Sequence, residues 1–159
     1  QWMPRVLVGE AFRQSGQCPN AAEEYRAAIT IRPREEFPYT RLASCLIEIH
    51  ELDGAEVVLK QLRAVSPRSQ DASMGLGVFA LLDGREGEAR AYLREAVNRD
   101  PPRPRASLLL AFMDGTLSED ETKRVCDELR VVAGDTLSVD VCVSGDHQRD
   151  SDASSHPSR

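Results

Sequence analysis

Apolar residues along most of the chain recur at intervals of three and four, a spacing that predicts amphipathic helices with one face packed. The pattern has a longer period as well, because Pro33, Pro67 and Pro101 are equally spaced along the chain. Each proline ends an apolar stretch, since the residue before a proline avoids the helical backbone conformation. A period of about 34 residues predicts an array of stacked units, each made of two short helices.

Turn residues and small residues recur with the same period. Gly16, Asp53–Gly54 and Asp83–Gly84 are the expected turns between the two helices of the three units. Small side chains stand at three equivalent positions of each unit, where two helices must approach closely: Gly9, Ala43 and Gly77; Ala21, Ala55 and Ala89; Ala28, Leu62 and Ala96. Leu62 is the one residue of these nine that is not small. The sequence therefore predicts three helical hairpins that pack in the same way.

These positions resemble the tetratricopeptide repeat (TPR), a 34-residue helical hairpin with small residues and a proline at fixed places. Three copies between residues 3 and 101 follow the pattern, and the first also keeps the aromatic places with Phe12 and Tyr25. The resemblance implies an all-α fold, a right-handed α-solenoid of helix hairpins. It also implies a concave groove, lined by the first helix of each repeat, that binds a peptide or a helix.

Beyond Pro101 the repeat is shortened. A helix is expected from Pro104 to about Met113, where Asp114–Gly115 ends it, so that a truncated fourth repeat follows the three full ones. Ser118–Glu121 has the sequence of a capping box, which predicts a further helix to about residue 132 with one charged face. We expect this helix to cap the array, and residues 1–134 to form one domain.

The last part of the chain has a different pattern. Residues 136–143 alternate apolar and polar side chains, which is a strand pattern without a partner strand, and residues 144–159 are polar and predicted to be disordered. Residues 137–143 have three interpretations: they fold back into the apolar half of the groove, they begin another domain, or they are a linker.

Charge and hydropathy narrow the classes of partner. The 159 residues carry a net charge of −6, with 20 basic residues scattered among 26 acidic ones, so that a nucleic-acid partner is not expected. No apolar run reaches the roughly 18 to 20 residues that span a bilayer, so we expect no membrane insertion. The chain begins with Gln1–Trp2, from which we expect it to be a piece of a longer protein. The compartment stays open, with the cytoplasm as the default.

No group of residues suggests catalysis or a cofactor. The four cysteines are far apart in sequence, without a CxxC motif or a nearby histidine pair, which argues against a disulfide framework or a zinc site. Cys45 falls at a small interior position and is expected to be a packed residue. Paired carboxylates stand at helix starts, where they cap or complement the helix dipole. We therefore expect no enzymatic activity, no cofactor and no metal in these residues.

Projecting the family's groove onto the first helices selects its candidate partner-binding residues, which become more apolar toward the C-terminus: Glu10, Arg13, Phe37, Arg41, Ser44, Met74, Val78, Leu108 and Phe112. TPR domains that clamp the carboxylate tail of chaperones carry lysine and asparagine there, so that we do not expect such a tail to bind. Apolar positions beside Arg13 and Arg41 suggest a ligand with hydrophobic anchors and some acid. The alternative is that Met74, Val78, Leu108 and Phe112 pack against neighbouring helices.

The function that this resemblance implies is a non-catalytic protein–protein interaction scaffold. An alternative is an accessory or regulatory TPR segment of a larger multidomain enzyme such as a glycosyltransferase. A further hypothesis is a homo-oligomer formed through repeat one, because Trp2, Val6 and Leu7 have no preceding helix to cover them.

Overall fold

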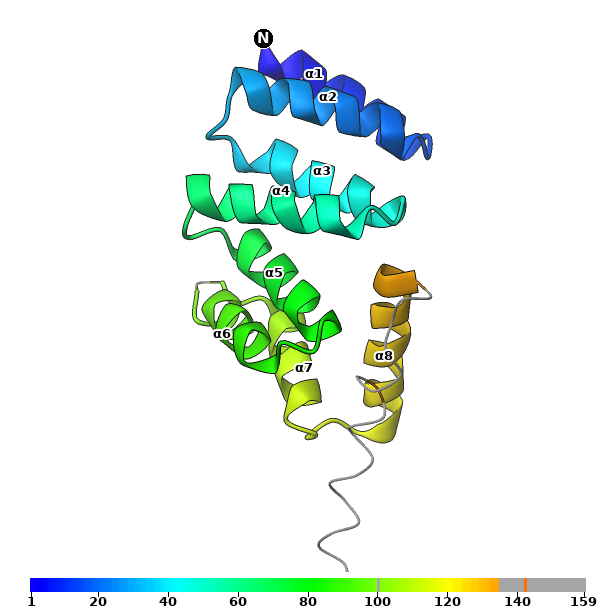
Figure 1. The fold of residues 1–159 in the computed structure, drawn as a ribbon, viewed down its shortest axis with the longest axis vertical. Coiled ribbons are helices and arrows are strands. Elements are labelled where there is room, and N and C mark those ends of the chain that lie inside the picture. Colours follow the sequence, from blue (N-terminus) through cyan, green and yellow to red (C-terminus); the bar gives the residue numbers. More distant parts are fainter. Residues whose placement is uncertain (100, 135–141, 143–159) are drawn as a thin grey trace, which may run out of the picture.

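A computed structural model describes residues 1–99, 101–134 and 142. Within these residues the chain forms eight helices and no strand (Figure 1): α1 (Trp2–Gln14), α2 (Cys18–Ile31), α3 (Glu36–Glu48), α4 (Leu52–Val65), α5 (Gln70–Leu82), α6 (Glu86–Val97), α7 (Pro104–Met113) and α8 (Glu119–Ala133). The all-α fold predicted from the sequence is confirmed.

The first six helices form three antiparallel hairpins stacked one on the next. Helix α1 packs on α2, α3 on α4 and α5 on α6, and successive hairpins meet through α2 with α3 and α4 with α5. Helix α7 continues the stack by packing on α6 (Figure 1). The first helices α1, α3, α5 and α7 therefore share one face of the array, and the N-termini of α3, α5 and α7 share one edge.

The recurring small residues lie where the hairpins close. Ala21, Ala55 and Ala89 are fully buried, and so are Ala28, Leu62 and Ala96. A Cβ atom added at Gly9 would stand 2.7 Å from Cε1 of Tyr25, and one added at Gly77 would stand 2.8 Å from Cγ of Leu93. These distances are too short for a side chain, so the two glycines allow the two helices of a hairpin to approach closely.

The turns inside the three hairpins lie at equivalent positions of the repeat, even where a turn-forming dipeptide lies elsewhere. Gly16, His50 and Gly84 occupy the same place in the three repeats and all have positive φ, at 74°, 59° and 71°. The turn predicted at Asp53–Gly54 is wrong, because both residues lie in the first turn of α4. Residue 50 takes the left-handed position of the turn even though it is not a glycine.

Replacing His50 with glycine is expected to stabilise the chain by about 1 kcal/mol. A side chain with a Cβ costs roughly 1–2 kcal/mol in the left-handed conformation, and glycine avoids that cost at the expense of unfolded-state entropy. His50 is exposed, so little packing is lost. Urea denaturation of the variant measures the gain. His50→Ala is the control, because alanine keeps the strain, and equal stability of the glycine and alanine variants would contradict the prediction.

Helix α8 begins as the sequence predicts. Ser118 accepts a hydrogen bond from the backbone amide of Glu121, and the Glu121 carboxylate accepts one from the amide of Ser118, which completes the capping box. The helix is not the missing second helix of the fourth repeat. It lies beside α5 and α7 (Figure 1), and its Val125 and Leu129 share a hydrophobic core with Val78.

One cysteine pair departs from the sequence expectation. Cys126 in α8 forms a disulfide with Cys142, so that the expectation of no disulfide is wrong for this pair. The sequence separation of 16 residues carries no signal of contact, because only the placement of residue 142 beside α8 brings the sulfur atoms together. The rest of the alternating segment 136–143, and the tail after it, lie outside the described residues. In the described part of the chain, no helix combines the length and apolarity needed to cross a membrane.

Candidate partner-binding groove

A groove of about 390 Å³ lies on the face of the first helices, between α3 and α5. Its lining is mostly apolar, with the buried Leu59 and Phe79 beneath it and a few polar or charged groups around it: Phe37, Thr40, Arg41, Ala43, Ser44, Ile47, Leu59, Asp71, Met74, Gly75, Val78, Phe79, Arg105 and Val132. Helices α3 and α5 supply most of these residues, and α4, α7 and α8 supply one each. The groove thus lies where the repeats' first helices face outward.

Helix α8 covers the part of the same face next to this groove. Val78 and Leu81 of α5 point outward from the hairpins by their place in the repeat, yet they are only 8% and 5% exposed. Both belong to the core that contains Val125 and Leu129 of α8. The chain therefore covers the outward face of its third repeat with its own amphipathic helix.

The C-terminal end of α8 reaches as far as the second hairpin. A Cβ added at Gly134 would lie 3.5 Å from Nδ1 of His50, in the turn after α3. At the other end of the groove face, Arg105 of α7 forms an ion pair with Glu128 of α8 at 3.4 Å. Helix α8 is thus joined to α7 by an ion pair, its C-terminal end lies near the turn after α3, and its Val132 forms one wall of the open groove.

The structure brings together five of the nine residues selected from the sequence. Phe37, Arg41, Ser44, Met74 and Val78 all line the groove, and Phe37 is 42% exposed. The other four do not line it: Glu10 and Arg13 belong to a charged network at the α1 side, while Leu108 and Phe112 are half-buried against the core around α7 and α8.

The charged network holds Arg41 at the edge of the groove. The Glu10 carboxylate accepts hydrogen bonds from Arg13, at 3.0 Å, and from the Tyr25 hydroxyl, at 2.7 Å. Nε of Arg41 lies 3.1 Å from Oε1 of Glu10, as an ion pair whose angle does not suit a hydrogen bond. The Arg41 guanidinium also lies over the Phe37 ring, 4.7 Å from its centroid.

Electrostatics keeps this network charged at neutral pH. Burial acts to raise the pKa of Glu10, but the hydrogen bonds from Arg13 and Tyr25 and the charge of Arg41 outweigh it, so that the pKa is lowered. Burial raises the pKa of Tyr25, so its hydroxyl stays protonated and donates. Glu10 is therefore already neutralised by two arginines, and the groove's N-terminal edge presents guanidinium rather than carboxylate.

Sequence reasoning did not select Asp71, Arg105 or Val132 for the groove. Asp71 lies in the first turn of α5, three residues before Met74, and Arg105 lies in the first turn of α7, three residues before Leu108. Because Met74 and Leu108 follow from the repeat phase, the same phase predicts Asp71 and Arg105 as groove positions. Val132 could be found only as one member of an apolar stripe with Val125 and Leu129, because nothing in the sequence says which surface that stripe covers.

Cys18 and Cys45 face each other behind the groove. Their sulfur atoms are 3.1 Å apart, and Sγ of Cys18 lies 2.9 Å from the Glu48 carboxylate. Both residues are buried, which confirms Cys45 as a packed residue, and burial raises the pKa of both thiols. A protonated thiol without solvent access is a poor nucleophile.

We expect Cys18 and Cys45 to react with a thiol reagent at least about 100-fold more slowly in the native chain than an exposed thiol does, because the thiolate is the reactive form. The rate is measured by absorbance with an aromatic disulfide reagent, in buffer and in urea. Ser44→Cys supplies the reference, because Ser44 is exposed and directly precedes Cys45. Native Cys18 or Cys45 reacting as fast as this reference thiol would contradict the burial.

The first helix leaves part of its surface uncovered. Val6 is buried and Trp2 half-buried, so the large apolar residues exposed on α1 are Met3, Leu7 and Val8, at 47%, 62% and 45%. Self-association through repeat one stays a prediction. Light scattering over a range of concentrations tests it, and a monomeric mass throughout would remove it.

The family comparison agrees with the fold and its period. The family model described as tetratricopeptide repeat matches residues 41–104, a range that contains α4, α5 and α6 in full. Residues 41–104 of the chain therefore match the tetratricopeptide repeat family. Comparison with curated proteins gives no match. Tetratricopeptide repeats are in general protein-interaction modules and are typically non-enzymatic.

Proposed function

We propose that the chain is a non-catalytic interaction scaffold that binds an amphipathic helix of a partner protein in the groove between α3 and α5. The observation that carries the proposal is the division of one face into two parts. Helix α8 covers the part around Val78 and Leu81, while the part around Phe37 and Met74 is open and apolar. A helix seated in the open part would extend the packing that α8 already makes.

Helix α8 indicates what such a partner needs. It presents Val125, Leu129 and Val132 to the repeats, at intervals of four and three, and keeps its charged residues outward. The open groove offers Phe37, Ile47 and Met74 to a similar stripe. A helix with two or three aliphatic or aromatic anchors at these intervals fits this chemistry.

Charge at the groove favours an acidic group beside those anchors. Arg41 and Arg105 line the groove, each with an ion-pair partner outside it, Glu10 and Glu128, and Asp71 is the one carboxylate among the lining residues. Asp71 is itself paired with Arg103, at 2.7 Å, so that its charge is already compensated. A carboxylate on the partner next to its apolar stripe could replace part of the water around Arg41, whose guanidinium is held in place by Phe37 and Glu10.

Selection from a random peptide library with the full chain tests this proposal. Enriched peptides are expected to carry apolar residues at helical spacing with a neighbouring acid. The variant Phe37→Ser with Ser44→Glu changes two exposed groove residues without touching the core, and it should lose about tenfold or more in affinity for those peptides.

The matched control is Val57→Ser with Gln61→Glu on α4, which removes an exposed apolar side chain and adds one negative charge outside the groove. This control should bind as the parent chain does. Peptides that lack apolar helical spacing, or that bind the groove variant and the parent equally, would contradict the proposed groove function.

A further inference from the structure

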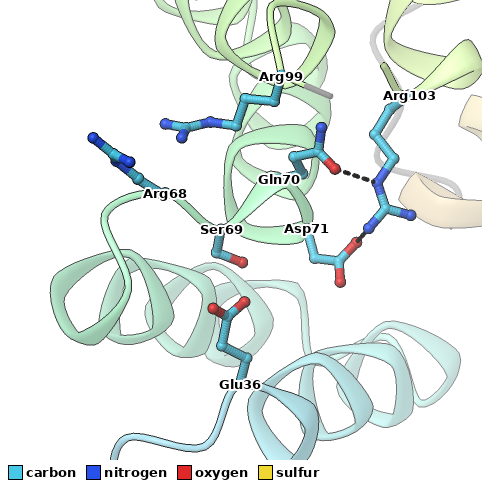
Figure 2. A pocket seen from close by; sticks show the side chains of 7 residues that line it. All are labelled: Glu36, Arg68, Ser69, Gln70, Asp71, Arg99 and Arg103. Carbon is cyan, nitrogen blue, oxygen red and sulfur yellow. Dashed lines mark hydrogen bonds and ion pairs between the residues drawn. The ribbon is translucent and has the colours of Figure 1, made fainter. Parts of the chain in front are cut away.

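A second hollow, which shares only Asp71 with the groove, lies at the edge where the helix N-termini meet. It has a volume of about 460 Å³ and lies between the start of α3, the start of α5 and the segment that joins α6 to α7. Figure 2 shows its side chains, which come from three successive repeats. In contrast to the groove, its lining is polar and contains three arginines and two carboxylates: Arg68, Arg99, Arg103, Glu36 and Asp71.

Both carboxylates of this hollow already have partners. Nη2 of Arg103 lies 2.7 Å from Oδ1 of Asp71, and Nε of Arg103 donates to the side-chain oxygen of Gln70 at 3.3 Å. Figure 2 shows these contacts on one side of the hollow. Glu36 accepts a hydrogen bond from the Ser66 hydroxyl at 2.6 Å. One arginine and one aspartate therefore compensate each other, which leaves two guanidinium groups facing a single remaining carboxylate.

Neither Arg68 nor Arg99 forms an ion pair with a carboxylate among the described residues, although the charge of Arg99 helps to lower the pKa of Glu95 on α6. Arg99 donates only to the carbonyl of Pro67, at 3.5 Å, and its Nε is buried without a hydrogen-bond partner within that part of the chain. Figure 2 shows both guanidinium groups on the side of the hollow away from Arg103, one from the loop before α5 and one from the end of α6. Two guanidinium groups that line the same hollow repel each other, and an anion between them would relieve this repulsion.

The N-terminus of α5 adds to this positive potential. Ser69 caps the helix by accepting from the amide of Ala72, and Gln70 and Asp71, which also line the hollow, are in the first turn, where amide groups have no partner inside the helix. The side-chain amide of Gln70 donates to the carbonyls of Ala96 and Pro101, at 3.3 and 2.8 Å. These two side-chain-to-backbone bonds hold the α6–α7 connection, which carries Arg99, against the start of α5.

We propose that this hollow binds a phosphate group, with Arg68 and Arg99 as its ligands and the first turn of α5 beside them. A phosphate group presents several acceptor oxygens and up to two negative charges, which matches two planar guanidinium groups better than a monovalent ion does. Arg68 and Arg99 both lie outside the groove, with which the hollow shares only Asp71, so the site does not depend on the proposed partner helix. The phosphate can be free or can be a monoester on a larger molecule, and the test below separates the two.

Titration of the isotope-labelled full chain, followed by amide chemical shifts at constant ionic strength, tests this site. The probes are inorganic phosphate and phenyl phosphate, with sodium chloride as the reference. Saturable shifts at Gln70 and Asp71 with either phosphate probe are the expected result. Binding of both probes would show that the phosphate group suffices, and binding of phenyl phosphate alone would indicate a monoester carried by a larger ligand.

The variant Arg68→Gln with Arg99→Gln is expected to weaken phosphate binding at least about tenfold, because each lost charge-assisted hydrogen bond is worth a factor of this size. The control Arg34→Gln with Arg94→Gln removes the same charge at exposed positions outside the hollow and should leave binding unchanged. If the double variant loses helical signal, Arg68→Gln alone, at an exposed residue, must show the weakening. Shifts equal to those in chloride, or binding unaffected by these variants, would overturn the site.

Discussion

Tyr25→Ala is expected to lower the free energy of unfolding by about 4 kcal/mol, because truncating a buried aromatic side chain costs roughly 3–5 kcal/mol. Tyr25 is fully buried, and its ring lies against the place where a Cβ would stand on Gly9. Its hydroxyl also donates to Glu10, at the edge of the groove. Denaturation followed by circular dichroism measures the loss.

Tyr25→Phe separates the ring from the hydroxyl. This variant keeps the packing and loses only the hydrogen bond to the Glu10 carboxylate, so the expected cost is about 2 kcal/mol. Equal costs for the alanine and phenylalanine variants would contradict the account, because the ring would then contribute nothing to joining α1 and α2.

The contact of Tyr25 with Gly9 adds a second check on the same hairpin. Gly9→Ala should destabilise the parent chain, because the new Cβ would stand 2.7 Å from the ring. In the Tyr25→Ala background that obstacle is gone, and Gly9→Ala should then stabilise by about 1 kcal/mol through helix propensity. If Gly9→Ala changed the free energy of unfolding in the same direction in both backgrounds, the close approach of Gly9 to the Tyr25 ring would be contradicted.

Leu129→Asp is expected to detach α8 from the repeats at a cost of about 3 kcal/mol, since it loses a buried leucine and places a carboxylate in an apolar core. Leu129 is only 1% exposed and shares its core with Val78 and Leu81. Helices α1 to α6 also pack on one another within and between the hairpins, so most of the helical signal should persist. An apolar fluorescent dye should bind several-fold better because the face under α8 becomes accessible.

Val131→Asp is the matched control for this variant. It makes the same change of charge two residues away on the same helix, at a side chain that is 75% exposed. Dye binding and stability should stay close to those of the parent chain. If Leu129→Asp behaved like Val131→Asp, α8 would not cover the repeats as the structure shows.

The three hairpins could be predicted from the sequence because their signal is local and repeated. Each copy places small residues and a proline at the same phase, and the buried alanines 21, 55 and 89 follow from that phase alone. The sequence does not predict the turn at His50, for a related reason. Asp53–Gly54 has stronger turn chemistry than His50–Glu51, but the packing of α3 on α4 places the turn where the repeat period puts it.

The position of α8 could not be predicted in the same way. Its capping box and its stripe of Val125, Leu129 and Val132 are clear in the sequence, but an apolar stripe does not specify the surface that covers it. The groove residues, too, could be predicted only in part from the sequence. Phe37 and Met74 were found by repeat phase, whereas the burial of Val78 depends on α8, which is separated from it in the chain by both α6 and α7.

The measurement that tests the groove most directly is an amide chemical-shift map of the full chain with a peptide enriched in the library selection. The account predicts the largest changes on α3 and α5, around Phe37, Ser44 and Met74, with smaller changes at Val132 of α8. Largest changes on α2, α4 and α6, with the residues around Phe37 and Met74 unaffected, would contradict the groove between α3 and α5 as the partner-binding site.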